Sequence, residues 1–541
     1  MALWTVIGVC CVAPLIWLLL EMSSWDFWRN VQWDGFRWRL LARTLLYNGG
    51  AAVVAVLMGL PAAVVVGRGR GVAAKLLMFL LPLGLVMPSV AYTYGWEHVL
   101  LLSGIKLVPA SVPDVLRCVW TLAAWLWALP ALVIGMSLRG LDSQVQQAAM
   151  LDGALWRVTG RLLAGPITAS LAMTMALAVQ EFAVYERTGI VVISTEVRTV
   201  FESGIGSGDS PANVAGVVGG SGRGADNQAR RAGAALATSL PMILLAAGLT
   251  GTALIILRRS RFAESLEAGG FPQCVEARWL PKLITAALWT LTVAVPVAAM
   301  VLCISPYRWK TDSAGHGIVM RTWLWAGNDI LGTLFYGALA GGATLVLALL
   351  AAVRLRPVLL LMALAAFLIG GEILAIADIR LFNREGGFWQ LIYNGPAIMV
   401  ITCVGRFGWI GLVAGFTTTG GAWHALRDTA AVDGAGTWQS MRRLVWPLAW
   451  PVLLGSAVLV MILTMTEVSA AVLVSPLRPT MLVPRLMGWV HTLRYDDMLE
   501  GTLLLAGLAA ALGAGAVGLI WLGRRARVRS ERWGVYQIEF D

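Results

Sequence analysis

Residues 147–154, with the sequence Gln-Ala-Ala-Met-Leu-Asp-Gly-Ala, decide the interpretation of this chain, because residues 428–435 repeat their pattern as Asp-Thr-Ala-Ala-Val-Asp-Gly-Ala. In both copies a proline follows the glycine by thirteen residues. The matched positions are Gln147, Ala148, Ala149, Asp152, Gly153 and Pro166 in the first copy and Asp428, Thr429, Ala430, Asp433, Gly434 and Pro447 in the second. Every pair is separated by the same interval of 281 residues. This shared interval predicts an internal duplication.

Each copy predicts two short helices joined by a glycine turn. Small side chains precede the glycine, arginines follow it, and the proline then opens an apolar stretch. Gly153 and Gly434 supply the freedom at positive φ that a sharp reversal after a helix requires. The alanine and threonine side chains allow the backbone of the first helix to approach a partner closely. We therefore expect both reversals to contact a partner protein.

The composition places the chain in a lipid bilayer. Hydrophobic residues make up 58% of it and charged residues only 13%, against about 25% charged residues in soluble domains. A helix of about 20 apolar residues crosses the hydrocarbon core of a bilayer. Twelve segments are predicted to do so, near residues 3–20, 44–66, 77–102, 117–137, 166–184, 236–257, 283–304, 331–353, 358–378, 394–416, 448–474 and 501–523. The predicted fold class is an all-α membrane protein with about twelve transmembrane helices.

Basic residues favour one side of these predicted spans. Arginines and lysines gather after the second, fourth, sixth, eighth, tenth and twelfth spans, and such clusters are typical of cytoplasmic segments. Both termini and both repeated loops are therefore predicted to be cytoplasmic. The same bias accounts for the net charge of +11, so we predict no nucleic-acid partner. The first span has no basic residues before it and no clear cleavage site after it, which favours an uncleaved helix.

The predicted spans divide into two homologous halves of six. The first half covers residues 1–258 with its loop at 141–166, and the second covers 283–541 with its loop at 422–447. A polar, cytoplasmic linker at 259–282 joins them. Each half also has a similar span entry, at residues 43–48 and 332–336, where the interval is 289 residues. The halves are thus predicted to act as a pseudo-dimer that differs by small insertions or deletions.

The repeated loop resembles the EAA loop of ABC-importer permeases, whose pattern is Glu-Ala-Ala, three residues, Gly, nine residues and Ile-x-Leu-Pro. Gln147 and Asp428 stand at the glutamate, Thr429 replaces one alanine, and Leu163 and Leu444 stand at the isoleucine. The resemblance extends over nearly the whole chain and implies the fused transmembrane subunit of a binding-protein-dependent ABC importer. In such importers this loop couples a separate ATPase to helix movement.

The resemblance also implies partners, a location and a solute. It implies two copies of an ABC ATPase subunit, an extracytoplasmic solute-binding protein and the bacterial cytoplasmic (inner) membrane. Residues 87–96 and the stretch around Glu467 resemble segments of iron(III)-type permeases, which implies ferric iron as the solute. Thiamine, polyamines, sulfate and phosphonate are the alternatives.

Four acidic residues lie within or beside predicted spans, where charge is costly and indicates function. They are Glu97, Glu181, Glu372 and Glu467. For Glu467 a role in the translocation path or its gate competes with polar packing between helices. Glu97 and Glu372 are expected to pair with polar partners at an interface between helices, in preference to contacting the solute. The counterpart of Glu467 in the first half is Glu181 by local pattern and Glu186 by the 281-residue interval.

No ATP-binding motif is present. The chain has four lysines and none follows a glycine, so a phosphate-binding loop that ends in Gly-Lys cannot be built. We predict no catalytic residue, and ATP and Mg belong to the partner ATPase. The six cysteines lack CxxC spacing, which argues against a disulfide framework or a zinc site. We predict no metal site and no cofactor bound by this chain. The alternative from another class is a proton-coupled secondary transporter with internal repeats, but it leaves the repeated loops unexplained, as does a structural membrane scaffold.

Overall fold

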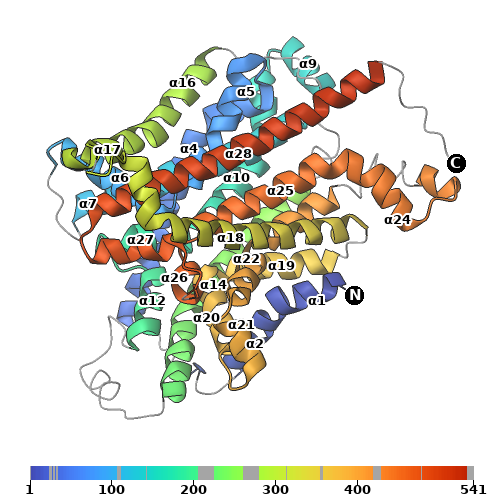
Figure 1. Cartoon of the computed structure of the whole chain (residues 1–541). Coiled ribbons are helices and arrows are strands. Elements are labelled where there is room, and N and C mark those ends of the chain that lie inside the picture. Colours follow the sequence, from blue (N-terminus) through green and yellow to red (C-terminus); the bar gives the residue numbers. More distant parts are fainter. Residues whose placement is uncertain are drawn as a thin grey trace.

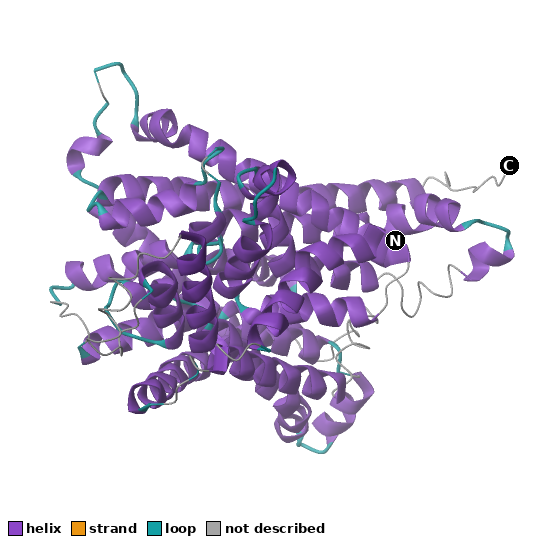
Figure 2. Ribbon diagram, turned by 90° about the horizontal axis from the view of Figure 1, so that it is seen from below, coloured by secondary structure: helices purple, strands orange, loops and turns teal. Residues whose placement is uncertain are grey.

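The computed structural model describes residues 2–23, 27–28, 31, 34–105, 111–141, 143–204, 224–259, 279–311, 313–353, 357–417, 428–476 and 478–532. Most of the linker predicted at 259–282 lies outside these residues, as does the start of the second loop, at 422–427. Every regular element among the described residues is a helix, as Figure 1 and Figure 2 show. The predicted all-α fold class is therefore confirmed.

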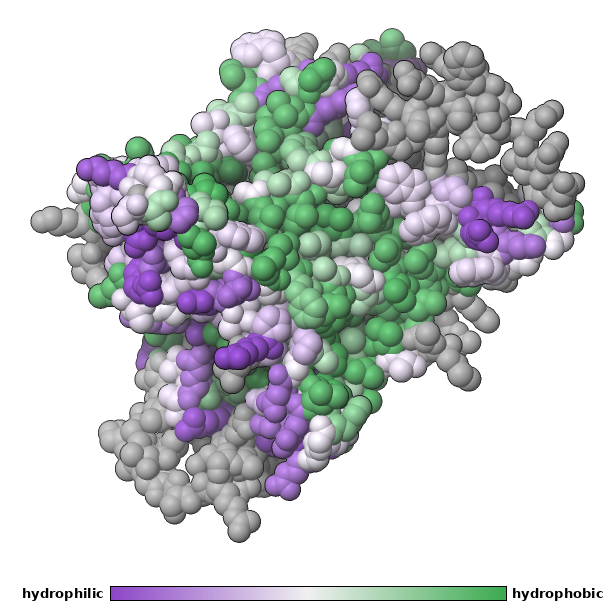
Figure 3. All heavy atoms as spheres, viewed as in Figure 1, coloured by the Kyte–Doolittle hydropathy of each residue, from purple (hydrophilic) through white to green (hydrophobic). Residues whose placement is uncertain are grey.

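Nine helices in the described residues are long and apolar enough to cross a bilayer, and three bent pairs raise the number to twelve if each pair is one span. The nine spans are formed by α1 (Ala2–Ile7) with η1 (Gly8–Val12) and α2 (Ala13–Met22), α4 (Gly35–Arg68), α10 (Leu155–Val179), α14 (Gly224–Arg259), α16 (Trp279–Trp289) with η3 (Thr290–Ala294) and α17 (Val295–Cys303), α18 (Ile318–Val353), α22 (Pro396–Phe416), α25 (Trp446–Thr466) and α28 (Tyr495–Arg532). Figure 3 shows hydrophobic side chains gathered across the middle of the visible face and hydrophilic ones toward its ends. The chain is a multi-pass membrane protein.

Three of the predicted spans are pairs of helices with a bend between them. The pairs are α5 (Gly71–Leu80) and η2 (Leu81–Val86) with α6 (Ser89–Leu102), bent by 98°; α7 (Val112–Leu126) with α8 (Ala128–Arg139), bent by 40°; and α19 (Pro357–Ile369) with α20 (Gly371–Phe382), bent by 104°. The two sharp breaks have local causes. Met87 is extended because a residue before proline is disfavoured in the helical region, and Gly370 has a φ of +93°, which favours glycine.

A similar succession of helices follows the repeated loop in the N-terminal part (residues 2–259) and in the C-terminal part (residues 279–532). Each long helix that follows a repeated loop is succeeded by two shorter ones, which are α11 (Ala183–Glu186) and α12 (Ile193–Ser203) in the first case and α26 (Ala471–Val474) and α27 (Leu482–His491) in the second. A buried hydrogen bond also recurs. The Thr44 hydroxyl accepts from the Ile193 amide at 3.1 Å, and the Thr333 hydroxyl accepts from the Leu482 amide at 2.9 Å.

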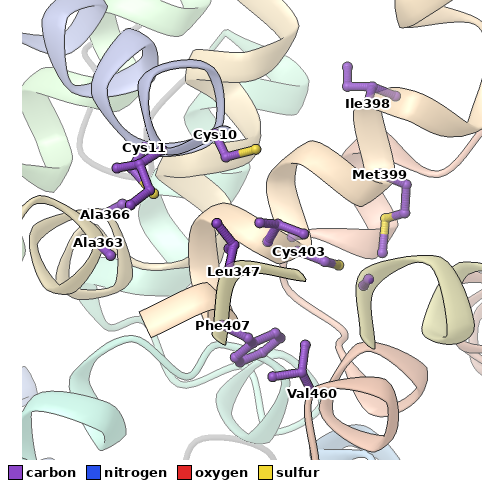
Figure 4. Close-up of a cluster of buried hydrophobic side chains, with 14 of the residues drawn as sticks. Cys10, Cys11, Leu347, Ala363, Ala366, Ile398, Met399, Cys403, Phe407 and Val460 are labelled. Atoms are coloured by element: carbon purple, nitrogen blue, oxygen red, sulfur yellow. The ribbon is translucent and has the colours of Figure 1, made fainter. Parts of the chain in front are cut away.

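The first helix of each part packs against the other part. The segment α1–α2 contacts α18, α19, α20 and α22, while α16–α17 contacts α4, α5 and α6. Figure 4 shows Cys11 of η1 beside Ala366 of α19, in the hydrophobic cluster that also contains Cys10 and Cys403. Across the other junction, the Tyr92 hydroxyl donates to the Thr292 carbonyl at 2.5 Å. The two parts therefore complete each other's cores.

The backbones of α18 and α25, both in the C-terminal part, lie in close contact, and substitution can test this helix packing. A Cβ at Gly341 would lie 2.7 Å from the Ala457 carbonyl oxygen, whereas a Cβ at Gly342 would meet no atom within 4 Å. We expect Gly341→Ala to lower the free energy of unfolding by about 1–3 kcal/mol through overpacking. Gly342→Ala is the matched control and should be neutral or slightly stabilising because alanine favours helix. Thermal unfolding in detergent measures both, and equal effects would contradict this packing.

Candidate functional site

The first repeated loop forms a tight reversal after α9 (Ser143–Leu151). The Gly153 amide donates to the Met150 carbonyl at 3.1 Å and the Ala154 amide donates to the Ala149 carbonyl at 2.8 Å. Gly153 has a φ of +62°. These two hydrogen bonds and the left-handed glycine form the Schellman motif, which satisfies the last carbonyls of a helix. The next helix, α10, begins at Leu155.

The second repeated loop has the same geometry. The Gly434 amide donates to the Ala431 carbonyl at 3.1 Å, the Ala435 amide donates to the Ala430 carbonyl at 2.9 Å, and Gly434 has a φ of +79°. A Cβ at Gly153 or Gly434 would meet no atom within 4 Å. Both glycines are therefore required by the backbone conformation and not by lack of space. The predicted glycine reversal is confirmed in both copies.

Pro166 departs from its predicted position. It lies inside α10 and is buried, so it does not open the helix after the first loop. The helix instead begins directly after the reversal, because the Schellman motif leaves the chain free to restart a helix at once. Pro447 does lie near the start of α25, but π-helical η5 (Met441–Val445) and α24 (Thr437–Ser440) precede it.

Both reversals expose apolar side chains. Leu151 and Val432 occupy matched positions and are 89% and 87% exposed. Trp156 and Trp438, in the helices that follow, are 73% and 76% exposed. Gln147, Ala148, Asp152, Asp428, Thr429 and Asp433 are also exposed, whereas Ala149 is buried and Ala430 half-buried. Only some of the small residues can therefore meet a partner directly. In Figure 1, α9 and α24 lie toward the same end of the bundle.

Arg68 links the first reversal to the transmembrane helices. This residue ends α4 and is buried, and its Nη2 donates to the Thr159 hydroxyl at 3.5 Å. Its guanidinium also lies 5.9 Å from the centre of the Trp156 ring, within the range of a cation–π contact. Arg68 thus connects the end of α4 with the start of α10, directly after the first reversal.

Glu181 and Glu467 are buried and have matching surroundings. Each follows the end of a long helix, at the C-terminus of α10 or α25. Glu181 accepts from the Ser89 hydroxyl at 2.9 Å and from the Ala183 amide at 3.0 Å. Glu467 accepts from Arg406 Nη1 at 2.8 Å and from the Ala470 amide at 3.0 Å. Glu181 and Glu467 therefore share a position just after a long helix and a hydrogen bond from a nearby backbone amide.

Glu372 lies in the first turn of α20, directly after the break at Gly370. It is 3% exposed, and neither carboxyl oxygen has a hydrogen-bond partner within the described part of the chain. This finding corrects the expectation that Glu372 belongs to a satisfied pair. A Cβ at Gly371 would lie 3.0 Å from Glu467 Oε1, and one at Gly370 would lie 3.4 Å from Gln180. The break between α19 and α20 thus brings Glu372 close to the segments that carry Glu181 and Glu467.

Glu97 belongs to a separate cluster. Its carboxylate lies 3.6 Å from Arg117 and 3.5 Å from Arg187, and Arg117 also pairs with Asp114 at 3.0 Å. This arrangement is the satisfied ion pair that the sequence favoured, so Glu97 does not join the other three acids. Glu186 lies in a further ion pair, 3.2 Å from Arg198. Burial raises the pKa of Glu186 above its ordinary value, although Arg198 opposes this shift.

Arg406 joins Glu181, Glu372 and Glu467 in a buried central group. The sequence did not lead us to predict a role for this arginine. It lies within the predicted tenth span, and its position in an apolar stretch was a usable signal because intramembrane arginines are rare and functional. The described residues contain no group of three His, Cys, Asp or Glu side chains that could hold a metal ion. The central group consists of three carboxyl groups and one guanidinium group.

Comparison with protein-family models found no match, and comparisons with curated proteins and with solved structures also found none. Two features of the molecule therefore carry the functional argument. One is the pair of exposed reversals at one end of the bundle, and the other is the buried group of Glu181, Glu372, Glu467 and Arg406.

Proposed function

We propose that this chain is the transmembrane permease subunit of a binding-protein-dependent ABC importer. The observation that carries the proposal is the pair of matching glycine reversals, each ending in a Schellman motif and exposing an aliphatic side chain at the same position. Two such surfaces suit two copies of one ATPase subunit. A separate ATPase would use ATP and Mg, and an extracytoplasmic binding protein would deliver the solute.

The repeated element order supports a fusion of two homologous halves, residues 1–258 and 283–541, joined by a linker at 259–282. The first span of each half also contains a π-helical turn, η1 in the first and η3 in the second, which adds to this support. The arginine clusters favour cytoplasmic termini and reversals, in a bacterial cytoplasmic membrane. In this arrangement each half contributes one ATPase-docking reversal and one buried carboxyl of the matched pair formed by Glu181 and Glu467.

The coupling would run through the reversals into the long helices. Closure of the ATPase dimer would displace α9 and the helical residues before Gly434. Arg68 would carry the movement at the first reversal into α4 through its contacts with Thr159 and Trp156. The central group of Glu181, Glu372, Glu467 and Arg406 lies at the breaks of the bent pairs. It would then lie on the translocation path, which opens and closes. Breaks in spanning helices are tolerated where the backbone is buried in protein or lines a cavity.

The solute is assigned by resemblance alone. The segments at residues 87–96 and around Glu467 favour ferric iron, with thiamine, polyamines, sulfate or phosphonate as alternatives. The buried carboxyls also fit a second candidate function, a proton-coupled secondary transporter, because such proteins relay protons through intramembrane acids. The two functions differ in what drives uptake.

Uptake into proteoliposomes separates these functions. The chain is purified with the ATPase and binding protein of its own host, and ATP and an imposed pH gradient are varied independently. We expect uptake that requires ATP and changes less than about twofold with the gradient. The chain without ATPase should hydrolyse no ATP. Gradient-driven uptake without ATP would overturn the importer and favour the secondary transporter.

A further inference from the structure

A line of carboxyl groups runs from the surface into the middle of the protein. We define this carboxyl line as Glu202, Glu186, Glu372, Glu181 and Glu467. The Glu202 and Glu186 side chains are 51% and 28% exposed, whereas the other three residues are buried. Glu186, Glu181, Arg198 and Arg406 all lie within electrostatic range of Glu372. The line therefore extends from partly exposed carboxyl groups to the buried central group.

The cations beside this line are already paired. Arg198 lies 3.2 Å from Glu186 and 2.8 Å from Glu202, and Arg406 lies 2.8 Å from Glu467. His491, at 3.9 Å from Glu186, lies at the exposed end of the line. Five carboxyl groups thus face two guanidinium groups, so the line has an excess of acid.

Glu372 is the carboxyl group of this line that lacks a hydrogen-bond donor among the described residues. Glu181 has two hydrogen-bond donors and Glu467 has an amide and a guanidinium, but the Glu372 oxygens have no donor within the described residues. A buried carboxyl group without partners is costly, because it has lost its hydration. A positively charged group that enters beside it would supply the missing hydrogen-bond donors.

We infer that Glu372 is a binding point for a positively charged group of the transported solute, which is therefore a cation. This inference rests on the proposed function in that it takes the central group to lie on the transport path. An anion such as sulfate or a phosphonate would instead face the excess of carboxyl groups. With no cluster of metal ligands in the described residues, the contact is a single charge interaction that holds the solute weakly and lets it pass.

Thermal stability of the purified chain in detergent tests this inference. The cationic probes are spermidine, thiamine and the lanthanum ion, and the anionic probes are sulfate and methylphosphonate, all at matched ionic strength. Glu372→Gln removes the ionisable carboxyl group and no hydrogen bond among the described residues, and the exposed Glu385 gives the matched control Glu385→Gln. We expect at least one cationic probe at about ten times its Kd to raise the Tm of the wild type and of Glu385→Gln by about 1–3 °C. Glu372→Gln should not respond, and the anionic probes should have no effect.

The outcomes separate this inference from the proposed function, because no ATPase is present in the measurement. A cationic response that is lost in Glu372→Gln supports the inference even if uptake later proves to be gradient-driven. Stabilisation by an anionic probe, no response to any cationic probe, or an equal response in Glu372→Gln overturns it. If Glu372→Gln does not fold, Glu181→Gln replaces it, and the comparison of cations with anions on the wild type decides by itself.

Discussion

Replacing Leu151 and Val432 together by glutamate is expected to release the ATPase from this chain without unfolding the chain. The two side chains are 89% and 87% exposed, so the substitutions disturb no internal contact. An apolar contact with a partner would instead be replaced by two buried charges, which cost several kcal/mol. We expect at least a 100-fold loss of ATPase affinity, equal to about 2.7 kcal/mol or more. Co-purification of the ATPase and ATP-driven uptake measure this loss.

The control for this prediction is Leu391→Glu, which alters an equally apolar and 74% exposed residue of α21 (Gly387–Tyr393). It should leave both ATPase binding and the Tm unchanged. The single variants Leu151→Glu and Val432→Glu should each weaken binding by less than the pair, because each leaves one reversal intact. Normal uptake by the double variant would place the ATPase elsewhere and remove the main support for the importer.

The reversals could be predicted from the sequence because their geometry is local. A glycine that follows a short helix and adopts positive φ needs no distant contact, so Gly153 and Gly434 were sufficient signals. The spans could also be predicted, since apolar length alone indicates them. Their ends could not, because α18 begins at Ile318 although the apolar segment was predicted to begin at 331. The helix α18 extends beyond the N-terminal end of the apolar segment.

The central group depends on contacts between distant residues, and the sequence could identify its members only one by one. The break at Gly370 is visible locally as a glycine pair, but its 104° bend is not. Nor does the sequence show that Arg406 and Glu467, 61 residues apart, form an ion pair. The packing of α1–α2 against the C-terminal part is likewise absent from any local pattern. These contacts come from tertiary packing of helices that have nearly uniform apolar surfaces.

Loss of the Arg406 guanidinium is expected to be among the most destabilising single changes in the chain. The Arg406 and Glu467 side chains are 11% and 7% exposed, and they are 2.8 Å apart. Arg406→Leu leaves the Glu467 carboxyl buried with only the Ala470 amide as donor, and removing one partner of a buried pair costs about 3–5 kcal/mol. Thermal unfolding in detergent measures the loss. Arg478→Leu is the control, because Arg478 is exposed and makes no ion pair in the described structure, and its change should stay within about 0.5 kcal/mol.

The double variant Arg406→Leu, Glu467→Gln distinguishes a stability role from a transport role. If the cost of Arg406→Leu comes from an uncompensated charge, neutralising Glu467 should restore most of the lost stability, and the coupling energy should be about 1–3 kcal/mol. The restored protein would still lack the ion pair beside the break between α19 and α20, so ATPase binding should be normal while ATP-driven uptake falls. No rescue of stability would mean that Arg406 acts through packing of its side chain and not through Glu467. Rescue with undiminished uptake would place the pair outside the moving part of the transport path.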